Sequence, residues 1–331
     1  MLNLGFIGLG VGKRHLEEAL RNPNSTCKMA CDFSLKNLAE VKSKYPSLST
    51  TTNPHDVLEN PEIDLIVVAS HDNYHTKQIL TGLKNGKHIF AEKPMCLSSE
   101  DFNLIENELN KNKDLKLTTN FPLRFTTYFE KIKKSIVNND FGTIYSMEGD
   151  YLYGRFEKIT KGWRGDLSNY STILGGAIHM IDLLLWFSNS RPTEVFAVGS
   201  NLASKNTKFQ REDFVTAFIK LETDLILKTS ANFACIHPHF HSVRIFGTKK
   251  TFINTCNSGN YLKKKNGEYK EFKLGETEID YQSANLLTKF VDSIVLKKPQ
   301  PISFNDIKLT MSTCFAINQS LAEKKNKFLY E

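Results

Sequence analysis

The chain has 331 residues, 40% hydrophobic and 24% charged, with a formal net charge of +7; at roughly 150 residues per domain this predicts about two packed domains and excludes a disordered or fibrous chain. No apolar run approaches the ~20 residues of a membrane span, and no Lys or Arg precedes the apolar N-terminal stretch, so we expect neither a membrane protein nor a signal peptide but a cytoplasmic protein. The lysine clusters lie on separate segments and the six cysteines form no CxxC pair, which speaks against nucleic-acid binding and a zinc site and favours free thiols.

The first part of the chain alternates short apolar runs with longer amphipathic stretches. Ser98 and Asp101 resemble a capping box, and Gly86 is placed to close the preceding helix. The predicted strands are Leu2–Gly8, Cys27–Cys31, Asp64–Ala69, Lys87–Ala91 and Leu115–Thr119, and the predicted helices are Lys13–Arg21, Leu35–Lys44, Thr76–Asn85 and Ser98–Asn110. This alternation predicts an α/β domain with a doubly wound parallel sheet.

After about Asn139 the pattern changes to alternating polar and apolar residues, which is typical of antiparallel strands. Asn266-Gly267 stands between two such runs and predicts a type I′ hairpin. The predicted strands are Thr143–Tyr153, Thr193–Gly199, Asp213–Leu221, Leu225–Phe233, Ser242–Phe246, Asn260–Lys264 and Glu268–Phe272, and the predicted helices are Gly175–Phe187, Tyr281–Leu296 and Phe304–Lys324. We therefore expect a second domain with a largely antiparallel sheet.

The first predicted strand runs into Gly8, Gly10 and Gly12 and then into a helix. In a dinucleotide-binding turn these glycines allow the tight turn, the approach of a pyrophosphate and close helix packing, although here the third glycine comes one residue early. Asp32 ends the next strand. A carboxylate at this position accepts hydrogen bonds from the ribose hydroxyls and repels a 2′-phosphate. Phe33 follows without an adjacent Arg, so we predict NAD rather than NADP. The alternative is a tight turn without a ligand.

The segment from Asp64 to Cys96 resembles the Gfo/Idh/MocA oxidoreductases, the glucose–fructose oxidoreductase and inositol dehydrogenase family. It contains a buried strand, a loop with His75, a helix, and a strand that ends in Glu92-Lys93-Pro94. Further matches follow in order along essentially the whole chain: Asn120, Arg124-Phe125, Gly142-Thr143-Ile144, Trp163-Arg164, and Gly-Gly-x-x-His-x-x-Asp from Gly175 to Asp182.

This resemblance implies a Rossmann domain over residues 1–121 and an α+β domain with an open, mostly antiparallel sheet over residues 122–331. We also allow for the C-terminal helix packing back onto the first domain. The resemblance further implies hydride transfer between a nicotinamide cofactor and a hydroxyl-bearing carbon of a sugar, polyol or nucleotide sugar. Homodimers or homotetramers would form through the open sheet.

The resemblance also implies that Lys93 and His179 handle the proton. A lysine at the carboxyl edge of the sheet, beside an oxidised nicotinamide, feels a like charge and can exchange a proton with the reacting oxygen. A histidine is suited to proton transfer near neutral pH, although a lone histidine on an apolar helix is more often a packed core residue.

The family pattern is broken before this histidine. Many members carry Asp four residues before it, in a DxGxH pattern, whereas this chain has Gly175 there and Ala177 in the place of the glycine. We hypothesise that Asp182, three residues further along one helix face, holds the tautomer of His179 or binds a substrate hydroxyl. Asp166 and Tyr170 are weaker candidates.

The remaining expectations follow the same resemblance. We expect the cofactor to contact Gly8, Gly10, Val11, Gly12, Asp32, Ser70, His71, Asn73, His75, Glu92, Lys93, Asn120, Trp163 and Arg164. We expect the substrate to contact Lys93, Arg124, Tyr153, Arg155, His179 and Asp182. Helix capping is the alternative for Asn73 and His75, and Arg155 is suited to bind a phosphate or carboxylate.

His237, His239 and His241 alternate along a strand-like run that Pro238 interrupts. They would share a face, either in an oligomer interface or, as the weaker alternative, in a metal site; we expect no metal.

The sequence thus predicts an NAD-dependent oxidoreductase that acts on a sugar, polyol or nucleotide sugar. Two alternatives remain: a non-catalytic regulator of the same fold that binds NAD and a sugar, and an enzyme that uses tightly bound NAD transiently for elimination or hydrolysis.

Overall fold

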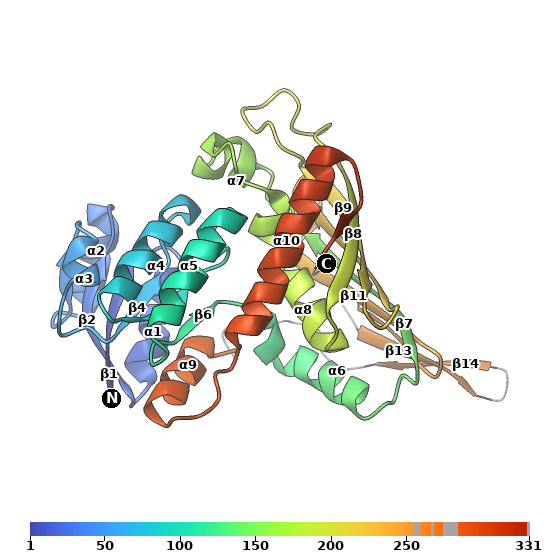
Figure 1. Cartoon of the computed structure of the whole chain (residues 1–331), viewed down its shortest axis with the longest axis horizontal. Helices are drawn as coiled ribbons and strands as arrows, with labels where there is room; N and C mark the ends of the chain where they lie inside the picture. The colour runs from blue at the N-terminus through green and yellow to red at the C-terminus, as the bar shows by residue number, and fades with distance from the viewer. Residues whose placement is uncertain (255–258, 266–267, 274–283, 330–331) are drawn as a thin grey trace. The chain divides into compact units, whose positions relative to one another are not determined.

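The computed structural model describes residues 1–254, 259–265, 268–273 and 284–329 (Figure 1). The chain forms two compact units. The first comprises Met1–Asn120 and Asn285–Ile307, and the second comprises Phe121–Ala284 and Lys308–Glu331. Each unit has its own sheet and its own buried core.

The first unit contains a six-stranded parallel sheet in the order β3-β2-β1-β4-β5-β6. Its strands are β1 (Leu2–Ile7), β2 (Ser25–Cys31), β3 (Ser49–Thr51), β4 (Leu65–Val68), β5 (His88–Ala91) and β6 (Leu117–Thr119). Its helices are α1 (Gly12–Arg21), α2 (Leu35–Lys44), α3 (His55–Leu58), η1 (Asp72–Tyr74), α4 (His75–Lys84), α5 (Ser99–Lys111) and α9 (Leu286–Val295). The predicted doubly wound parallel sheet is confirmed, and its topological switch point lies between β1 and β4.

Successive residues of β5 show how helices cover both faces of this sheet. Ile89 touches the α4 face, because a Cβ at Gly82 of α4 would lie 2.7 Å from its Cδ1. Phe90, which points to the opposite face, contacts the rings of His15 in α1 and Phe290 in α9 at centroid distances of 5.0 and 6.3 Å. Residues that alternate along one strand therefore place α4 and the α1–α9 pair on opposite faces.

The second unit contains a nine-stranded sheet in the order β14-β13-β12-β11-β7-β10-β9-β8-β15. Neighbouring strands are antiparallel except for β7 and β10, which are parallel, so the predicted mostly antiparallel sheet is confirmed. The strands are β7 (Ile144–Leu152), β8 (Pro192–Ser200), β9 (Phe214–Leu221), β10 (Ile226–Asn232), β11 (Phe240–Gly247), β12 (Thr251–Asn254), β13 (Gly259–Lys265), β14 (Glu268–Lys273) and β15 (Lys327–Phe328). The predicted Asn266-Gly267 turn lies outside the described residues, but Lys265 pairs with Glu268 on either side of it.

The helices of the second unit are η2 (Pro122–Phe125), α6 (Thr127–Val137), α7 (Glu157–Thr160), η3 (Trp163–Asp166), the π-helical turn η4 (Ile173–Ala177), α8 (Ile178–Ser188) and the larger part of α10 (Phe304–Glu323). Helices α8 and α10 lie against one face of the sheet (Figure 1). The Ser320 hydroxyl of α10 accepts a hydrogen bond of 3.0 Å from the Ala197 amide of β8. The helix predicted over Tyr281–Leu296 begins at Leu286 in the structure, and residues 281–283 lie outside the described part.

The other face of this sheet is exposed along β8, β9 and β10. Val195, Ala197 and Ile219 point into the core, whereas the residues that alternate with them are open to solvent. The exposed apolar residues on this open face are Phe196, Val198, Phe214, Phe218 and Ile226.

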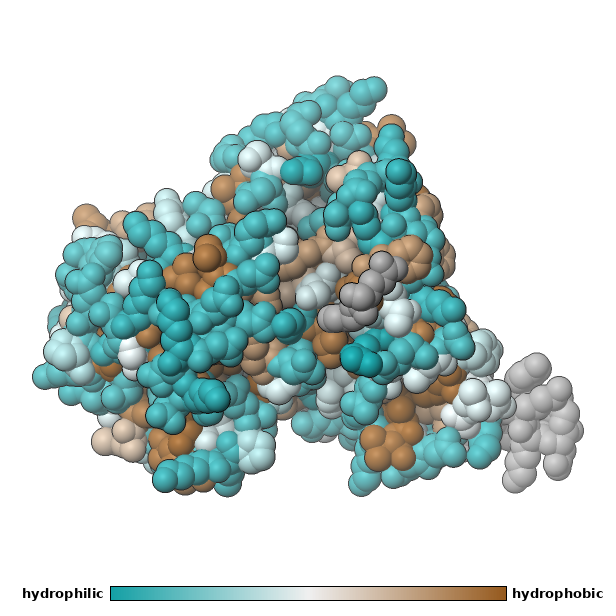
Figure 2. Space-filling model, viewed as in Figure 1, coloured by the Kyte–Doolittle hydropathy of each residue, from teal (hydrophilic) through white to brown (hydrophobic). Residues whose placement is uncertain are grey.

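The visible surface of α1, α4 and α5 is mostly hydrophilic (Figure 2). No helix within the described residues has the length and apolar character needed to cross a bilayer. Cys27, Cys31, Cys96, Cys235 and Cys314 are free thiols, and Cys256 lies outside the described part of the chain.

Candidate active site

The glycine turn after β1 has an open space at its centre. A Cβ at Gly8, whose φ is +90°, would meet the Ala69 carbonyl oxygen at 2.3 Å, and a Cβ at Gly12 would lie 3.2 Å from the Ala69 Cβ. A Cβ at Gly10 would meet no atom within 4 Å. Helix α1 begins directly after this turn, and the Val11 side chain does not cap the first amides of the helix. The turn therefore suits an anionic group such as a pyrophosphate.

Asp32 follows β2 beside this turn and is only 4% exposed. Its Oδ2 accepts a hydrogen bond of 2.6 Å from the Leu9 amide, and its Oδ1 accepts one of 2.7 Å from the Ser34 amide. Each carboxylate oxygen can accept a further bond, so the group can still receive ribose hydroxyls. Phe33 is 77% exposed, and its ring stands edge-on to His71 at 5.5 Å. These residues lie around one end of the glycine turn.

The loop after β4 is tied to the loop after β5. His75 is fully buried, its Nδ1 lies 2.8 Å from the Pro94 carbonyl oxygen, and its Nε2 lies 3.1 Å from the Ser70 carbonyl oxygen. The Ser70 hydroxyl donates to Gln78 at 2.7 Å, while Asn73 is exposed in η1. Because both ring nitrogens face backbone oxygens, we interpret His75 as a residue that positions the loop carrying Lys93 rather than as a cofactor ligand.

Glu92 is the centre of a hydrogen-bond network beneath Lys93. Its Oε1 accepts from His15 Nε2 at 2.7 Å and from Asn120 Nδ2 at 2.8 Å, and its Oε2 accepts from the Lys93 amide at 3.3 Å. Burial raises the pKa of Glu92, but the hydrogen bond and charge of His15 and the hydrogen bond of Asn120 outweigh it, so this pKa lies below its ordinary value. The ionised carboxylate therefore fixes the backbone at Lys93, which directly follows β5 at the carboxyl edge of the sheet.

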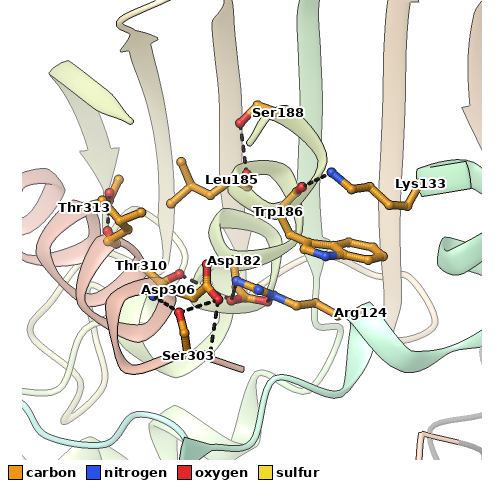
Figure 3. A network of polar contacts seen from close by, with 11 residues as sticks. Arg124, Lys133, Asp182, Leu185, Trp186, Ser188, Ser303, Asp306, Thr310 and Thr313 are labelled. Atoms are coloured by element: carbon orange, nitrogen blue, oxygen red, sulfur yellow. Dashed lines mark hydrogen bonds and ion pairs between the residues drawn. The ribbon is translucent and has the colours of Figure 1, made fainter. Parts of the chain in front are cut away.

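In the second unit, Asp182 is engaged in a buried ion pair (Figure 3). Its Oδ2 accepts from Arg124 Nε at 2.9 Å, and its Oδ1 accepts from Arg124 Nη2 at 2.7 Å and from the Thr310 hydroxyl at 3.3 Å. Asp182 is 0% and Arg124 is 4% exposed. This bidentate pair joins η2, α8 and α10, and it favours a structural role for both residues over the predicted contacts with His179 and substrate.

His179 lies half-buried in a cluster of rings from α8, β7 and β11. Its ring stacks on Tyr151 at a centroid distance of 6.0 Å and stands edge-on to His241 at 5.8 Å. Tyr153 stacks on Tyr151 at 5.6 Å, and His239 lies 5.1 Å from Tyr151. The structure thus brings the predicted Tyr153 and His179 into one cluster, with Tyr151, which the sequence analysis missed, between them.

The histidine triplet does not act as a set. His239 and His241 have ring centroids 4.9 Å apart, whereas the His237 ring lies beside Phe240, at 6.0 Å. Pro238 breaks the alternation, since β11 begins only at Phe240. Among the described residues no group of three or more His, Cys, Asp or Glu side chains is placed to hold a metal ion.

A cavity of about 1080 Å³ is lined in part by the residues that follow Tyr153 in the chain. Arg155 belongs to its wall, and the guanidinium carbon lies 5.4 Å from the centroid of the Tyr153 ring. Trp163 and Arg164 follow in η3, with the Arg164 guanidinium 4.3 Å from a Trp163 ring centroid. The wall of the cavity also contains Glu157, Lys158, Lys161, Ile236 and His237.

Comparison with known proteins agrees with this architecture. Residues 2–121 match the oxidoreductase family with the NAD-binding Rossmann fold, and residues 129–253 match the GFO/IDH/MocA C-terminal domain. The chain is 24% identical to a myo-inositol 2-dehydrogenase of Thermotoga maritima over 348 aligned positions, which cover 100% of this chain and 99% of that protein.

Two solved structures show the same fold. The scyllo-inositol dehydrogenase of Lactobacillus casei, with bound NAD(H) and scyllo-inositol, matches with a TM-score of 0.83 at 19% identity and covers 99% of each chain. A levoglucosan dehydrogenase in complex with NADH and levoglucosan matches with a TM-score of 0.87 at 18% identity and covers 100% of each chain. The chain belongs to the Gfo/Idh/MocA oxidoreductase family, and it is an enzyme, an NAD(P)-dependent dehydrogenase.

Proposed function

We propose that this enzyme transfers hydride between a hydroxyl-bearing carbon of a sugar or polyol and NAD. The observation that carries the proposal is the shared carboxyl edge of the parallel sheet, where the open turn at Gly10 follows β1, the carboxylate of Asp32 follows β2 and the tethered Lys93 follows β5. Ligands of doubly wound sheets bind at this edge. The inositol and levoglucosan dehydrogenases named above support a polyol or sugar as substrate.

For the cofactor, we favour NAD over NADP. The α1 amides and the space at Gly10 would hold the pyrophosphate, and Asp32 would accept the adenosine ribose hydroxyls. A 2′-phosphate would be repelled by this carboxylate. When bound, the nicotinamide supplies the hydride acceptor or donor. Tighter binding of NADP than of NAD in titrations would contradict this assignment.

For the proton, we propose Lys93 and His179. The reacting hydroxyl must lose a proton when the carbon loses hydride, and each of these side chains can exchange one with an oxygen. Glu92 and His75 would keep the Lys93 loop in place, since they bond to the Lys93 amide and the Pro94 carbonyl. Asp182 is assigned no proton, because both of its oxygens are engaged.

For the substrate, we propose that the cavity beside Tyr153 receives an anionic substituent. Arg155 and Lys158 bring positive charge to its wall, and the one carboxylate there, on Glu157, is paired with Lys161 at 2.6 Å. A guanidinium in such a place can bind a phosphate or carboxylate. Sugar phosphates and sugar acids should therefore outperform the neutral parent sugars, and the Arg155→Gln variant should lose that preference through KM.

The test of the activity is absorbance of the reduced nicotinamide. Purified protein and NAD are mixed with inositols, levoglucosan, free sugars, sugar phosphates, sugar acids and nucleotide sugars, beside a Lys93→Met variant. Turnover that disappears in the variant establishes the dehydrogenase and names its substrate. Intact NAD binding with no turnover on any compound would instead favour a regulator, or an enzyme that retains and recycles its cofactor.

We further propose that the open face of the second sheet joins subunits into a dimer or tetramer. Five large apolar side chains are exposed on β8, β9 and β10, and contiguous apolar patches of this kind mark interfaces. Light scattering should give a mass of two or four chains, and Phe218→Asp should lower it. A monomer for the unmodified protein would reject this arrangement.

A further inference from the structure

Helix α1 carries a histidine that reaches from this helix to the residue before Lys93. His15 is 6% exposed, and its ring stands edge-on to Phe90 of β5 at a centroid distance of 5.0 Å. Its Nε2 lies 2.7 Å from Glu92 Oε1, in a pair whose side chains are 8% and 12% exposed. Within the described residues the buried Nδ1 of this ring has no hydrogen-bond partner. The contact between Nε2 and Glu92 therefore orients the ring.

The Glu92 carboxylate is held from three elements. His15 of α1 and Asn120, which follows β6, both donate to Oε1, the latter at 2.8 Å. The other oxygen, Oε2, accepts from the Lys93 amide, which follows β5. An ionised carboxylate is planar and only accepts hydrogen bonds, so the two donors to Oε1 determine where Oε2 points. The position of Oε2 in turn fixes the backbone that carries the Lys93 side chain.

The contact between His15 and Glu92 supplies geometry more than stability. Replacing both partners of a buried polar contact by apolar groups of the same shape can be nearly neutral, because the cost of desolvation offsets the attraction. A hydrogen bond to a carboxylate is restricted in length and direction, whereas apolar packing is not directional. Two apolar residues could therefore fill this space, but they would not aim the carboxylate at the Lys93 amide.

The same helix would bind the cofactor. His15 lies three residues after Gly12, the first residue of α1, and so within the first turn of the helix. The amides of this turn and the space at Gly10 are the proposed site of the pyrophosphate. One helical turn therefore joins the proposed pyrophosphate site to the carboxylate that supports Lys93.

We propose that His15 is a positioning residue. Through Glu92 it fixes the Lys93 backbone relative to helix α1, and hence relative to the nicotinamide cofactor that this helix would hold. The structural part of this inference is independent of the proposed function, and its catalytic consequence rests on it.

Backbone amide hydrogen exchange, resolved by nuclear magnetic resonance in the full-length protein, tests the structural part. His15→Leu should accelerate exchange at the Lys93 amide about three- to tenfold, the equivalent of one lost hydrogen bond. The amide of Ile66, buried in β4 between two strands, is the internal reference for global stability and should change less. His15→Gln should restore slow exchange, because its side-chain amide can donate to Glu92. An unchanged Lys93 amide, or equal acceleration at Ile66, would overturn the proposal.

His15→Asn decides the question if His15→Leu does not fold. It keeps a polar amide at this position, but its shorter side chain ends before the position of the ring Nε2, so exchange at Lys93 should again accelerate. His55→Asn is the matched control, because His55 Nδ1 lies 2.7 Å from Glu59 Oε1 in an exposed pair of the same unit. It should leave the Lys93 amide unchanged. Slow exchange at Lys93 in His15→Asn, or acceleration in His55→Asn, would contradict the assignment.

Enzyme kinetics supply the catalytic readout, with the substrate that gives the highest turnover in the panel. His15→Leu should lower kcat roughly 10- to 100-fold, because a displacement of about 1 Å at a reacting group has an effect of this size. Calorimetric NAD affinity should change little, and His15→Gln should recover most of kcat. An active enzyme with the same kcat in His15→Leu would overturn the catalytic consequence. A silent panel together with selective acceleration at Lys93 would refute the proposed activity and leave His15 as the positioning residue.

Discussion

The glycine turn after β1 and the glycine pair before α8 have opposite surroundings. At Gly10 an added Cβ would meet no atom within 4 Å, whereas at Gly175 it would meet the Tyr170 hydroxyl at 1.9 Å. The first turn keeps space for a ligand, and the second makes space for the protein's own side chain. Lys93 and Asp182 also differ, since Lys93 is half-buried at the carboxyl edge of the sheet and Asp182 is fully buried in an ion pair.

The largest loss of stability is expected when the buried ion pair between Arg124 and Asp182 is broken. Arg124→Met should leave the Asp182 carboxylate buried and uncompensated, which typically costs about 3–5 kcal/mol of unfolding free energy. Urea denaturation monitored by circular dichroism measures it. The double variant Arg124→Met/Asp182→Leu is the control, because removal of both charges should restore most of the loss. A single variant as stable as the unmodified protein would show that the pair is not structural.

A smaller loss is expected at Gly175. Gly175→Ala should lower the unfolding free energy by about 1–3 kcal/mol, because the new methyl group overlaps the Tyr170 hydroxyl. Tyr170→Ala in the same chain should relieve the overlap, so the two changes together should cost less than their sum. Strict additivity in the thermodynamic cycle would contradict the contact.

Acid stability tests the network below Lys93. The pKa of Glu92 is lowered in the folded protein, so its stabilising contribution is present above the pKa of the unfolded chain, about 4.3, and is lost as the pH falls through the lower folded value. Glu92→Gln should therefore lose about 1.5 kcal/mol at neutral pH and show a shallower decline in acid. Thermal melts from neutral to acidic pH measure both. Parallel curves for the two proteins would be inconsistent with a depressed pKa.

At Gly10, where an added side chain would meet open space, a substitution should have almost no effect on stability. Gly10→Ala should change the unfolding free energy by less than ~0.5 kcal/mol, because the methyl group meets no protein atom. It should weaken NAD binding at least about tenfold, or about 1.4 kcal/mol, by entering the space proposed for the pyrophosphate. Calorimetric titration with NAD measures this effect. An unfolded variant, or one with unimpaired NAD affinity, would remove the distinction between the two turns.

Local patterns predicted most of the larger elements, but the 11-residue helix α6 was not predicted. The helix predicted over Leu35–Lys44 has those bounds in the structure, and the strand predicted over Asp64–Ala69 is β4. The shortest elements were missed: β3 and α3 span three and four residues, too few to show a period, and β15 consists of two residues that exist as a strand only because they pair with β8. The parallel pairing of β7 with β10 could not be predicted either, because tertiary packing determines the order of strands in a sheet.

Some residues of the candidate site could be predicted from the sequence, and others could not. Gly8, Gly10, Gly12 and Asp32 could be identified because their roles depend on spacing around one turn. The partners of Glu92 and Asp182 could not, since His15 and Arg124 lie 77 and 58 residues away in sequence. Tyr151 did leave a signal that the analysis passed over, because it stands two residues before Tyr153 in the predicted strand Thr143–Tyr153 and so would share its face.

The return of the chain to the first unit has a consequence for protein engineering. Phe290 packs on Phe90, and Asp292 accepts hydrogen bonds from Asn22 and Asn24 at 3.1 and 2.9 Å, so residues 285–307 complete the covering of the parallel sheet. A fragment that stops after the sixth strand would expose that apolar face to water and tend to aggregate. Transplanting the cofactor-binding half into another enzyme therefore requires two pieces of chain, which a circular permutant or a linker from Asn120 to Asn285 would supply.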